Sequence, residues 1–510
     1  MNKVFSAAIT GLEAELVEVE ADLTSGLRFF TIVGLPDKSV EESKERIAAA
    51  IKNSGAEPPH KQNKRVIINL APADLRKEGS SYDLPIAISF LLSSGQISFE
   101  PKNKLFVGEL ALNGGIRKVN GVLPICLLAK TKRIDTIFVP RENAHEARLV
   151  ENVKIIPVQS LGELMGYLEN RIEIKPLEPF AEDFLKNFET ISYPIDMAYI
   201  KGQENAKRAL EISASGNHNV LMVGPPGSGK TLLAKAIPSI LPRMTRDELL
   251  EVTKIYSVAG KLGSKKPLIS RRPFRSPHHS ASEASLIGGG SSAKPGEITL
   301  AHRGVLFIDE FPEIHRDVLE SLRQPLEDGL VSVARARASY VFPARFVLVA
   351  AMNPCPCGYY NDPEKECTCT QNQINKYQRK ISGPIMDRID LYVEVPHVKY
   401  EKLTDERIDG SSQEIRKRVE KARQIQIQRF KNDGIFTNSE MTIPLIKKHC
   451  KTDEAGDRLL RNAVNNLHMS ARGFHRILKL ARTIADLEES LNITSHHIAE
   501  ALQYRPKTEI

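Results

Sequence analysis

The sequence predicts an α/β protein in three parts: a parallel-sheet core, preceded by an α+β domain and followed by a helical domain. The chain has 510 residues, which is too long for a single hydrophobic core. From residue 195 to about 397, short apolar runs alternate with helical patterns, as in a parallel sheet with crossover helices. After Pro396 the composition turns helical. The expected domains are 1–170, 195–397 and 398–510, with 171–194 as a linker.

Individual helices and strands are predicted from the periodicity of apolar residues and from the glycine and proline residues that end each element. In the amino-terminal domain, strands are expected at 29–33, 65–70 and 136–139, and helices at 41–52 and 84–93. Core strands are expected at 219–223, 305–308, 346–351 and 390–395. The helical domain should hold helices near 413–432, 443–449, 453–467, 471–490 and 495–503. Pro176, Pro179 and Pro194 punctuate the polar linker.

The overall composition is that of a globular protein with a mild basic excess. Hydrophobic residues make up 41% of the chain and charged residues 26%, and the formal net charge is +8. This excess slightly favours a polyanion such as DNA as the partner. No segment has the apolar length needed to span a bilayer, and Met1–Ser6 lacks a signal-peptide core. We therefore expect no membrane partner and a cytoplasmic location.

A glycine-rich loop follows the apolar run 219–223. It matches the Walker A pattern for phosphate binding, with the residues Gly224, Pro225, Pro226, Gly227, Ser228, Gly229, Lys230 and Thr231. Backbone N–H groups of such a loop converge on phosphates, and the next helix directs its positive dipole end at them. Lys230 would bridge the β- and γ-phosphates, and the Thr231 hydroxyl would bind Mg²⁺. The loop predicts ATP binding.

The second half of an ATPase site is an apolar strand that ends in two acids. Residues 304–308 read Gly-Val-Leu-Phe-Ile, and Asp309 and Glu310 follow. Ligands of α/β sheets bind at the carboxyl ends of the strands. Asp309 would hold Mg²⁺, and Glu310 would orient the attacking water.

Three further polar residues are candidates for the nucleotide site. Asn353 follows the strand expected at 346–351, where an amide can sense the γ-phosphate. Arg388 is a candidate arginine finger, a residue that stabilises transition-state charge on a neighbour's phosphates. Arg472 begins a strong helix and could also reach the nucleotide.

Residues 331–346 predict a hairpin with Arg335 and Arg337 on one face of a strand. Arginines on a hairpin that faces a channel could track DNA phosphates without reading sequence. An exposed charged hairpin is the alternative, and spacing alone favours that alternative.

Four of the six cysteines form two Cys-x-Cys pairs, Cys355 with Cys357 and Cys367 with Cys369. Four thiolates could close a tetrahedral structural Zn²⁺ site. Reduced, packed cysteines remain the alternative, because the spacing within each pair is shorter than usual. His278 and His279 are weaker metal candidates, because adjacent residues are expected to face different directions.

Together these segments resemble the AAA+ ATPases of the magnesium-chelatase type. The resemblance rests on the Walker pair and on residues 200–210, 275–279, 322–329 and 382–388. With the segment Asn353–Gly358 and the amino-terminal extension, the whole chain is similar to the bacterial YifB/ComM (competence protein ComM) family. That family implies a hexameric ring motor that translocates on DNA, with helicase or branch-migration activity in homologous recombination or natural transformation.

The resemblance also implies roles for individual residues. Asn353 would be sensor 1, Arg388 the arginine finger, and Arg472 sensor 2, acting within its own chain or across a subunit interface. Gln203 falls in the segment that flanks the adenine base. The family's pore hairpins favour DNA contact by Arg335 and Arg337 over the exposed-hairpin alternative.

The amino-terminal domain resembles the Lon-protease catalytic domain, an α+β fold of the ribosomal S5 domain 2 type, through residues 76–81 and 106–117. Ser81 falls near the position of the nucleophilic serine. The lysine of a Ser-Lys dyad is replaced by Ile125, and the nearest following lysine is Lys130. Without a base the serine is inert, so we expect no peptidase activity.

The sequence and the resemblance together predict that the protein is an ATP-hydrolysing ring motor that acts on single-stranded or branched DNA. One alternative is a chelatase-type motor subunit that drives metal insertion into a tetrapyrrole through partner proteins. Another is an ATP-dependent Lon-like protease, which the absent dyad lysine disfavours.

Overall fold

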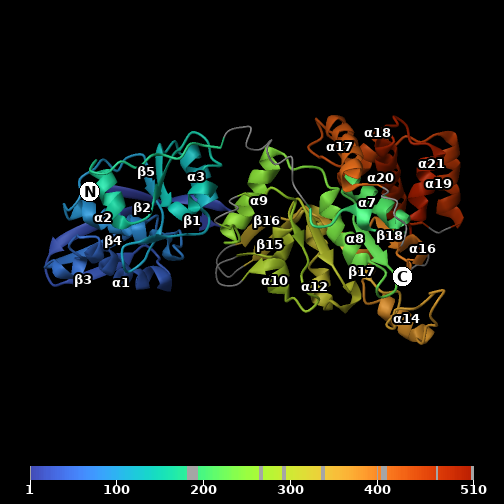
Figure 1. The fold of residues 1–510 in the computed structure, drawn as a ribbon, viewed down its shortest axis with the longest axis horizontal. Helices are drawn as coiled ribbons and strands as arrows, with labels where there is room; N and C mark the ends of the chain where they lie inside the picture. The colour runs from blue at the N-terminus through green and yellow to red at the C-terminus, as the bar shows by residue number, and fades with distance from the viewer. Residues whose placement is uncertain are drawn as a thin grey trace. The chain divides into compact units, whose positions relative to one another are not determined.

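The computed structural model describes residues 2–180, 193–263, 268–289, 294–334, 339–398, 400–403, 410–466 and 469–506. The chain divides into two compact units (Figure 1). The first comprises residues 1–189, 246–270 and 291–294, and the second comprises the rest. Of the helices in the described ranges, none combines the length and apolar character needed to cross a membrane.

The first unit is built on a seven-stranded mixed sheet of order β3-β4-β2-β1-β5-β8-β9. Its strands are β1 (Lys3–Thr10), β2 (Glu13–Ser25), β3 (Phe29–Val33), β4 (Lys64–Ala71), β5 (Lys104–Phe106), β8 (Thr136–Pro140) and β9 (Lys154–Val158). Its helices include α1 (Lys38–Asn53), α2 (Asp83–Ser93), α3 (Val122–Thr131), α4 (Ala144–Ala147) and α5 (Leu161–Leu168). The three strands and two helices expected here are confirmed. That this α+β unit has the Lon-protease fold remains a prediction.

A helix from the middle of the chain belongs to the first unit. This helix, α9 (Arg246–Val258), follows the Walker A helix in sequence but packs on α3. Gly121 N–H donates to the Ser257 carbonyl at 3.1 Å, and the Ser257 hydroxyl donates to the buried Glu146 carboxylate. The insertion after the Walker A helix therefore joins the amino-terminal core.

The second unit contains a parallel five-stranded sheet of order β11-β14-β17-β10-β18. The strands are β10 (Val220–Val223), β11 (Phe274–Arg275), β14 (Val305–Ile308), β17 (Val347–Met352) and β18 (Leu391–Glu394). The four strands expected in this region are confirmed. Strands β10, β14 and β17 are continuous apolar runs buried on both faces, whereas β18 alternates buried Leu391 and Val393 with more exposed Tyr392 and Glu394. The two-residue strand β11 was not predicted. This parallel sheet fits a P-loop AAA+ core.

Short helices and a hairpin complete the core. The helices are α7 (Glu204–Gly216), α8 (Lys230–Ala236), α10 (Glu283–Ile287), α11 (Glu297–Leu300), α12 (Arg316–Glu320), α13 (Arg323–Asp328), α14 (Gln371–Gln378), α15 (Gly383–Met386) and α16 (Tyr400–Leu403). The predicted hairpin is confirmed as antiparallel β15 (Leu330–Ala334) and β16 (Ser339–Pro343). Arg335 and Arg337, the expected DNA contacts, lie outside the described residues.

A helical region ends the chain, as predicted. It consists of α17 (Ser412–Arg429), α18 (Ile443–His449), α19 (Glu454–Asn466), α20 (Ala471–Leu487) and α21 (Ser495–Gln503), with α20 packed against α7, α17 and α21. The fully buried Asp486 accepts from Asn438 Nδ2 at 2.8 Å and from Arg482 Nε at 3.1 Å, and it pairs with Arg429. A buried carboxylate with two guanidinium partners fixes how these helices meet.

Candidate active site

The carboxyl ends of three neighbouring strands meet at one edge of the second unit's sheet. Val223 ends β10 opposite Met352, the end of β17, and Ile308 ends β14 opposite Ala350. Each strand delivers its next residues to this edge, namely Gly224 after β10, Asp309 and Glu310 after β14, and Asn353 after β17. Strand register therefore brings together residues that are far apart in the sequence.

The Walker A loop needs glycine where the backbone is crowded or left-handed. A Cβ at Gly224 would lie 2.0 Å from the Val395 carbonyl oxygen, so no side chain fits there. Gly227 and Gly229 have φ values of +79° and +92°, which other residues rarely adopt. Ser228 closes the turn, since its N–H donates to the Pro225 carbonyl at 3.3 Å.

The Lys230 ammonium lies inside this loop. Its Nζ donates to the carbonyl oxygens of Gly224 and Pro225 at 2.7 and 2.8 Å, and it lies 3.4 Å from Asn353 Oδ1. Burial lowers the pKa of Lys230 to about 8, although the Asp309 charge acts in the opposite direction. An anionic ligand in the loop would favour the charged ammonium.

The two predicted magnesium ligands lie together. Thr231 Oγ1 at the start of α8 donates to Asp309 Oδ2 at 2.8 Å. Hydroxyl and carboxylate oxygens are ligands that Mg²⁺ accepts, usually with phosphate oxygens and water completing the shell. The pair therefore fits the ion that the sequence predicts.

Glu310 has a partner that was not predicted. Its Oε2 lies 3.0 Å from Nδ1 of His279, which belongs to the loop before α10. The ring of His278 lies 4.1 Å from that of His279, whereas adjacent residues were expected to face different directions. That expectation is wrong, because alternation of side chains holds in a strand and this segment is irregular loop.

Gln203, expected near the adenine base, makes two contacts with the backbone around the loop. It is almost fully buried, and its Nε2 donates to the carbonyls of Ser228 at 3.2 Å and Pro396 at 2.7 Å. This amide ties the Walker A loop to the segment after β18. Contact with adenine remains a prediction.

Arg388 and Arg472 both have partners close to α15. Arg388 pairs with Glu327 and donates from Nη1 to the Pro384 carbonyl at 2.6 Å. Arg472, which is exposed, lies 3.3 Å from Asp387 through Nη1 and Oδ2. Their roles as arginine finger and sensor 2 remain predictions.

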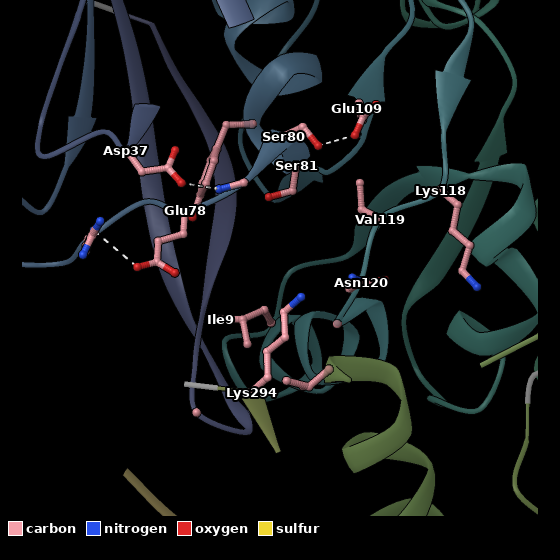
Figure 2. A pocket seen from close by; sticks show the side chains of 16 residues that line it. Ile9, Asp37, Glu78, Ser80, Ser81, Glu109, Lys118, Val119, Asn120 and Lys294 are labelled. Carbon is pink, nitrogen blue, oxygen red and sulfur yellow. Dashed lines mark hydrogen bonds and ion pairs between the residues drawn. The ribbon is translucent and has the colours of Figure 1, made fainter. Parts of the chain in front are cut away.

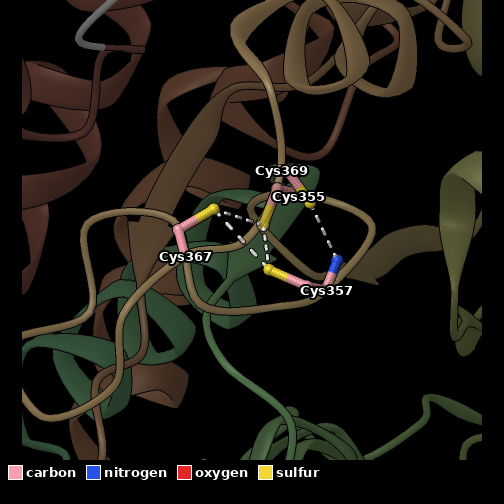
Figure 3. Close-up of side chains that lie close together, drawn as sticks. All are labelled: Cys355, Cys357, Cys367 and Cys369. Carbon is pink, nitrogen blue, oxygen red and sulfur yellow. Dashed lines mark hydrogen bonds between the residues drawn. The ribbon is translucent and has the colours of Figure 1, made fainter.

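The four clustered cysteines gather into one group (Figure 3), with all four Sγ atoms within 4.8 Å of one another. Cys367 Sγ lies 3.7 Å from Cys355 Sγ and 3.6 Å from Cys357 Sγ, and the Cys355–Cys357 distance is 3.3 Å. Cys369 accepts the Cys357 N–H through Sγ at 3.4 Å. The group could bind a metal ion, because thiolates at these separations suit tetrahedral coordination.

Comparison with known proteins identifies the family. The chain is 43% identical over 507 residues to competence protein ComM of Haemophilus influenzae, covering 98% of this chain and 97% of that protein. It is 40% identical over 509 residues to the protein YifB of Escherichia coli, covering 98% of this chain and 96% of that one. The chain belongs to the ComM/YifB family of magnesium-chelatase-like proteins.

The chain is also similar to magnesium chelatase. Models of magnesium chelatase subunit ChlI match residues 196–403 and 19–143, and a model of the ChlI carboxy-terminal part matches 409–505. The 67 kDa magnesium-chelatase subunit of Heliobacterium mobile is 25% identical over 294 residues, covering 52% of this chain and 42% of that subunit.

In this ComM/YifB family member, Ser81 lines a cavity of about 360 Å³ within the first unit (Figure 2). Ser80 there donates to Glu109, and Lys118 Nζ donates to the Leu262 carbonyl at 2.5 Å. At the position expected for the dyad lysine, Ile125 is buried in α3, whereas Lys130 is exposed. The absence of peptidase activity remains a prediction.

Proposed function

We propose that the chain is an AAA+ ATPase whose catalytic edge is the one formed by β10, β14 and β17. The observation that carries this proposal is the convergence of Lys230, the Thr231–Asp309 pair and Asn353 at a single sheet edge. ATP phosphates would lie on the Walker A loop, with Lys230 neutralising charge and Asn353 contacting the γ-phosphate. Mg²⁺ held by Thr231 and Asp309 would supply charge stabilisation to the phosphates.

Glu310 is the proposed general base. It follows Asp309 directly, so it lies beside the proposed Mg²⁺ ligands, and its carboxylate is half exposed. A carboxylate at this place can take a proton from the water that attacks the γ-phosphate. Arg388 would reach the phosphates of the neighbouring subunit in a hexameric ring, leaving the Walker A site of a single chain able to bind ATP but poor at hydrolysis.

We further propose that hydrolysis drives movement on single-stranded or branched DNA in the cytoplasm, with branch migration as the coupled activity. The 43% identity with competence protein ComM over 98% of this chain supports a role in competence or recombination. The net charge of +8 agrees with a polyanionic partner. Arg335 and Arg337, which follow β15 in the sequence, are the proposed phosphate contacts.

A chelatase-type motor is the second candidate, favoured by the magnesium chelatase models that match both units. Such a motor would act through partner proteins rather than DNA. ATP hydrolysis stimulated only when a partner protein and a porphyrin are both present would select it.

Two variants test the ATPase proposal. Lys230→Ala should lose ATP binding, measured with a fluorescent ATP analogue, because it removes the phosphate-bridging ammonium. Glu310→Gln should bind ATP with the wild-type dissociation constant and hydrolyse it at least about a hundredfold more slowly. Wild-type hydrolysis by either variant would show that the site is assigned to the wrong residues.

We also propose that the four clustered cysteines hold a structural Zn²⁺ ion. A tetrahedral Zn–S site with bonds of about 2.3 Å has sulfur–sulfur separations of about 3.8 Å. The observed distances of 3.6 and 3.7 Å from Cys367 are close to that value, and the Cys355–Cys357 distance of 3.3 Å would lengthen by about half an ångström on binding zinc.

A further inference from the structure

The cysteine group lies in a segment with little structure of its own. Between the end of β17 and the start of α14, residues 353–370 contain no helix or strand. Of the residues in this range, only Cys355 and Gly358 are buried. Backbone ladders and apolar packing therefore do little to hold its shape, and a crosslink through the four thiolates would do so instead.

This segment touches the Walker A loop at Gly358. A Cβ at Gly358 would lie 2.6 Å from Cδ and 2.8 Å from Cγ of Pro226, so the Gly358 backbone lies directly against that ring. Gly358 has φ of +90°, and its N–H donates to the Cys355 carbonyl at 3.0 Å. The turn that places Gly358 against Pro226 is thus the same turn that begins at Cys355.

The segment also carries the residue expected to sense the γ-phosphate. Asn353 precedes Cys355 by two positions, and its Oδ1 is the atom that lies 3.4 Å from Lys230 Nζ. On the other side, Gln378 Nε2 of α14 donates to the Pro354 carbonyl at 3.1 Å. Movement of residues 353–370 would therefore displace both the Walker A loop and Asn353.

We propose that zinc bound by Cys355, Cys357, Cys367 and Cys369 holds the Walker A loop in its ATP-binding shape through Gly358 and Pro226. Binding Zn²⁺ displaces the thiol protons to solvent and joins the two Cys-x-Cys pairs. The joined pairs fix the turn at Gly358, which supports Pro226 and positions Asn353. The inference rests on the proposed ATPase function and adds that ATP affinity depends on zinc.

The first test compares the zinc-loaded full-length protein with the same protein after zinc removal by a chelator under reducing conditions. Zinc content is measured by inductively coupled plasma mass spectrometry, and ATP affinity with a fluorescent ATP analogue. We expect about one zinc per chain, and removal of zinc should weaken ATP binding by about tenfold to a hundredfold. Restored affinity after adding Zn²⁺ alone would support the inference.

Substitutions distinguish the effect of zinc binding from the effect of the contact between Gly358 and Pro226. Cys367→Ser/Cys369→Ser should lose zinc and lose ATP affinity together. Gly358→Ala should keep zinc but lose ATP affinity, because its Cβ collides with Pro226. Gly434→Ala is the matched control, since Gly434 has φ of +70° and open space around a Cβ, and it should leave both quantities unchanged.

The outcomes distinguish this inference from the proposed function. If zinc-loaded wild-type protein binds no ATP, the ATPase proposal fails. If zinc-loaded and zinc-free proteins bind ATP equally well, the proposed function stands and the coupling is refuted. A purified protein that contains no zinc and takes up none on titration also overturns the inference. Circular dichroism of each variant identifies any that has simply unfolded.

Discussion

His279 Nδ1 lies 3.0 Å from Oε2 of Glu310, the proposed general base. The two side chains are 41% and 55% exposed, so their pairing contributes at most about 1 kcal/mol to stability. The contact with His279 instead affects the orientation of the Glu310 carboxylate. Glu310 has φ of +50°, an uncommon backbone conformation for this residue, and an imidazole partner restricts where its carboxylate points. We infer that His279 is a positioning residue for Glu310.

His279→Ala should lower kcat for ATP hydrolysis by about tenfold and leave the ATP dissociation constant unchanged, because only Glu310 loses its partner. His279→Asn should recover most of the rate, since Asn Nδ2 can replace imidazole Nδ1 as the donor. His278→Ala is the control, because His278 Nδ1 bonds to Ser280 Oγ at 2.7 Å. Equal losses of kcat in the His278 and His279 variants would refute the positioning role.

ATP binding should weaken as the pH rises above about 8. In the free protein the pKa of Lys230 is lowered from 10.5 to about 8, mainly by burial, so most chains carry a neutral amine at pH 9. The triphosphate needs the ammonium, so binding at pH 9 must take up a proton, whereas binding at pH 7 finds Lys230 already charged. Isothermal titration calorimetry in buffers of different ionisation enthalpy measures this uptake. Binding without proton uptake at pH 9 would show that Lys230 keeps an ordinary pKa.

Mixing two variants of the chain tests whether Arg388 acts across the proposed subunit interface. Arg388→Ala should slow hydrolysis by about a thousandfold while preserving ATP binding. Lys230→Ala chains lack a working Walker A loop but retain Arg388. Mixing the two inactive variants should recover hydrolysis, because an intact Walker A site of one chain then faces an intact Arg388 of its neighbour. If mixed rings form, seen by native mass spectrometry, and remain inactive, the arginine acts elsewhere.

Asp486→Ala should destabilise the helical region by about 3–5 kcal/mol, because it leaves Arg429 and Arg482 without their buried counter-charge. Urea unfolding followed by circular dichroism measures the loss. Glu489→Ala provides the comparison, since Glu489 pairs with Lys421 at 2.9 Å on the surface, and its loss should cost less than about 1 kcal/mol. If both substitutions lower the free energy of unfolding by similar amounts, the buried ion pairs of Asp486 contribute no more to stability than a surface pair.

Much of the second unit could be predicted from sequence because its strands are uninterrupted apolar runs. Uninterrupted apolar residues predict buried strands at Val220–Val223 and Val305–Ile308. The Walker residues follow the ends of these two strands directly. Strand β11 is only Phe274–Arg275, too short for any periodic signal. Its pairing with β14 brings the loop that carries His279 beside Glu310, so that contact could not be read from sequence.

The surfaces against which individual elements pack also could not be predicted from the sequence. Helix α9 (Arg246–Val258) was not predicted, and even an amphipathic pattern would not say which surface its buried face meets. In the structure it meets α3 rather than the sheet that flanks it in sequence. The contact of Gly358 with Pro226 is similar, because the glycine's left-handed φ and missing Cβ give no periodic signal.

Coupling of ATP hydrolysis to DNA is the main functional proposal for this protein. The most direct test is the steady-state ATPase rate of the full-length wild-type protein without DNA, with a linear duplex and with a four-way junction, at one fixed salt concentration. Glu310→Gln is the background control. We expect the junction to raise the ATPase rate well above the rates measured with duplex and without DNA. A rate that no DNA changes, but that a partner protein with a porphyrin raises, would contradict this proposal.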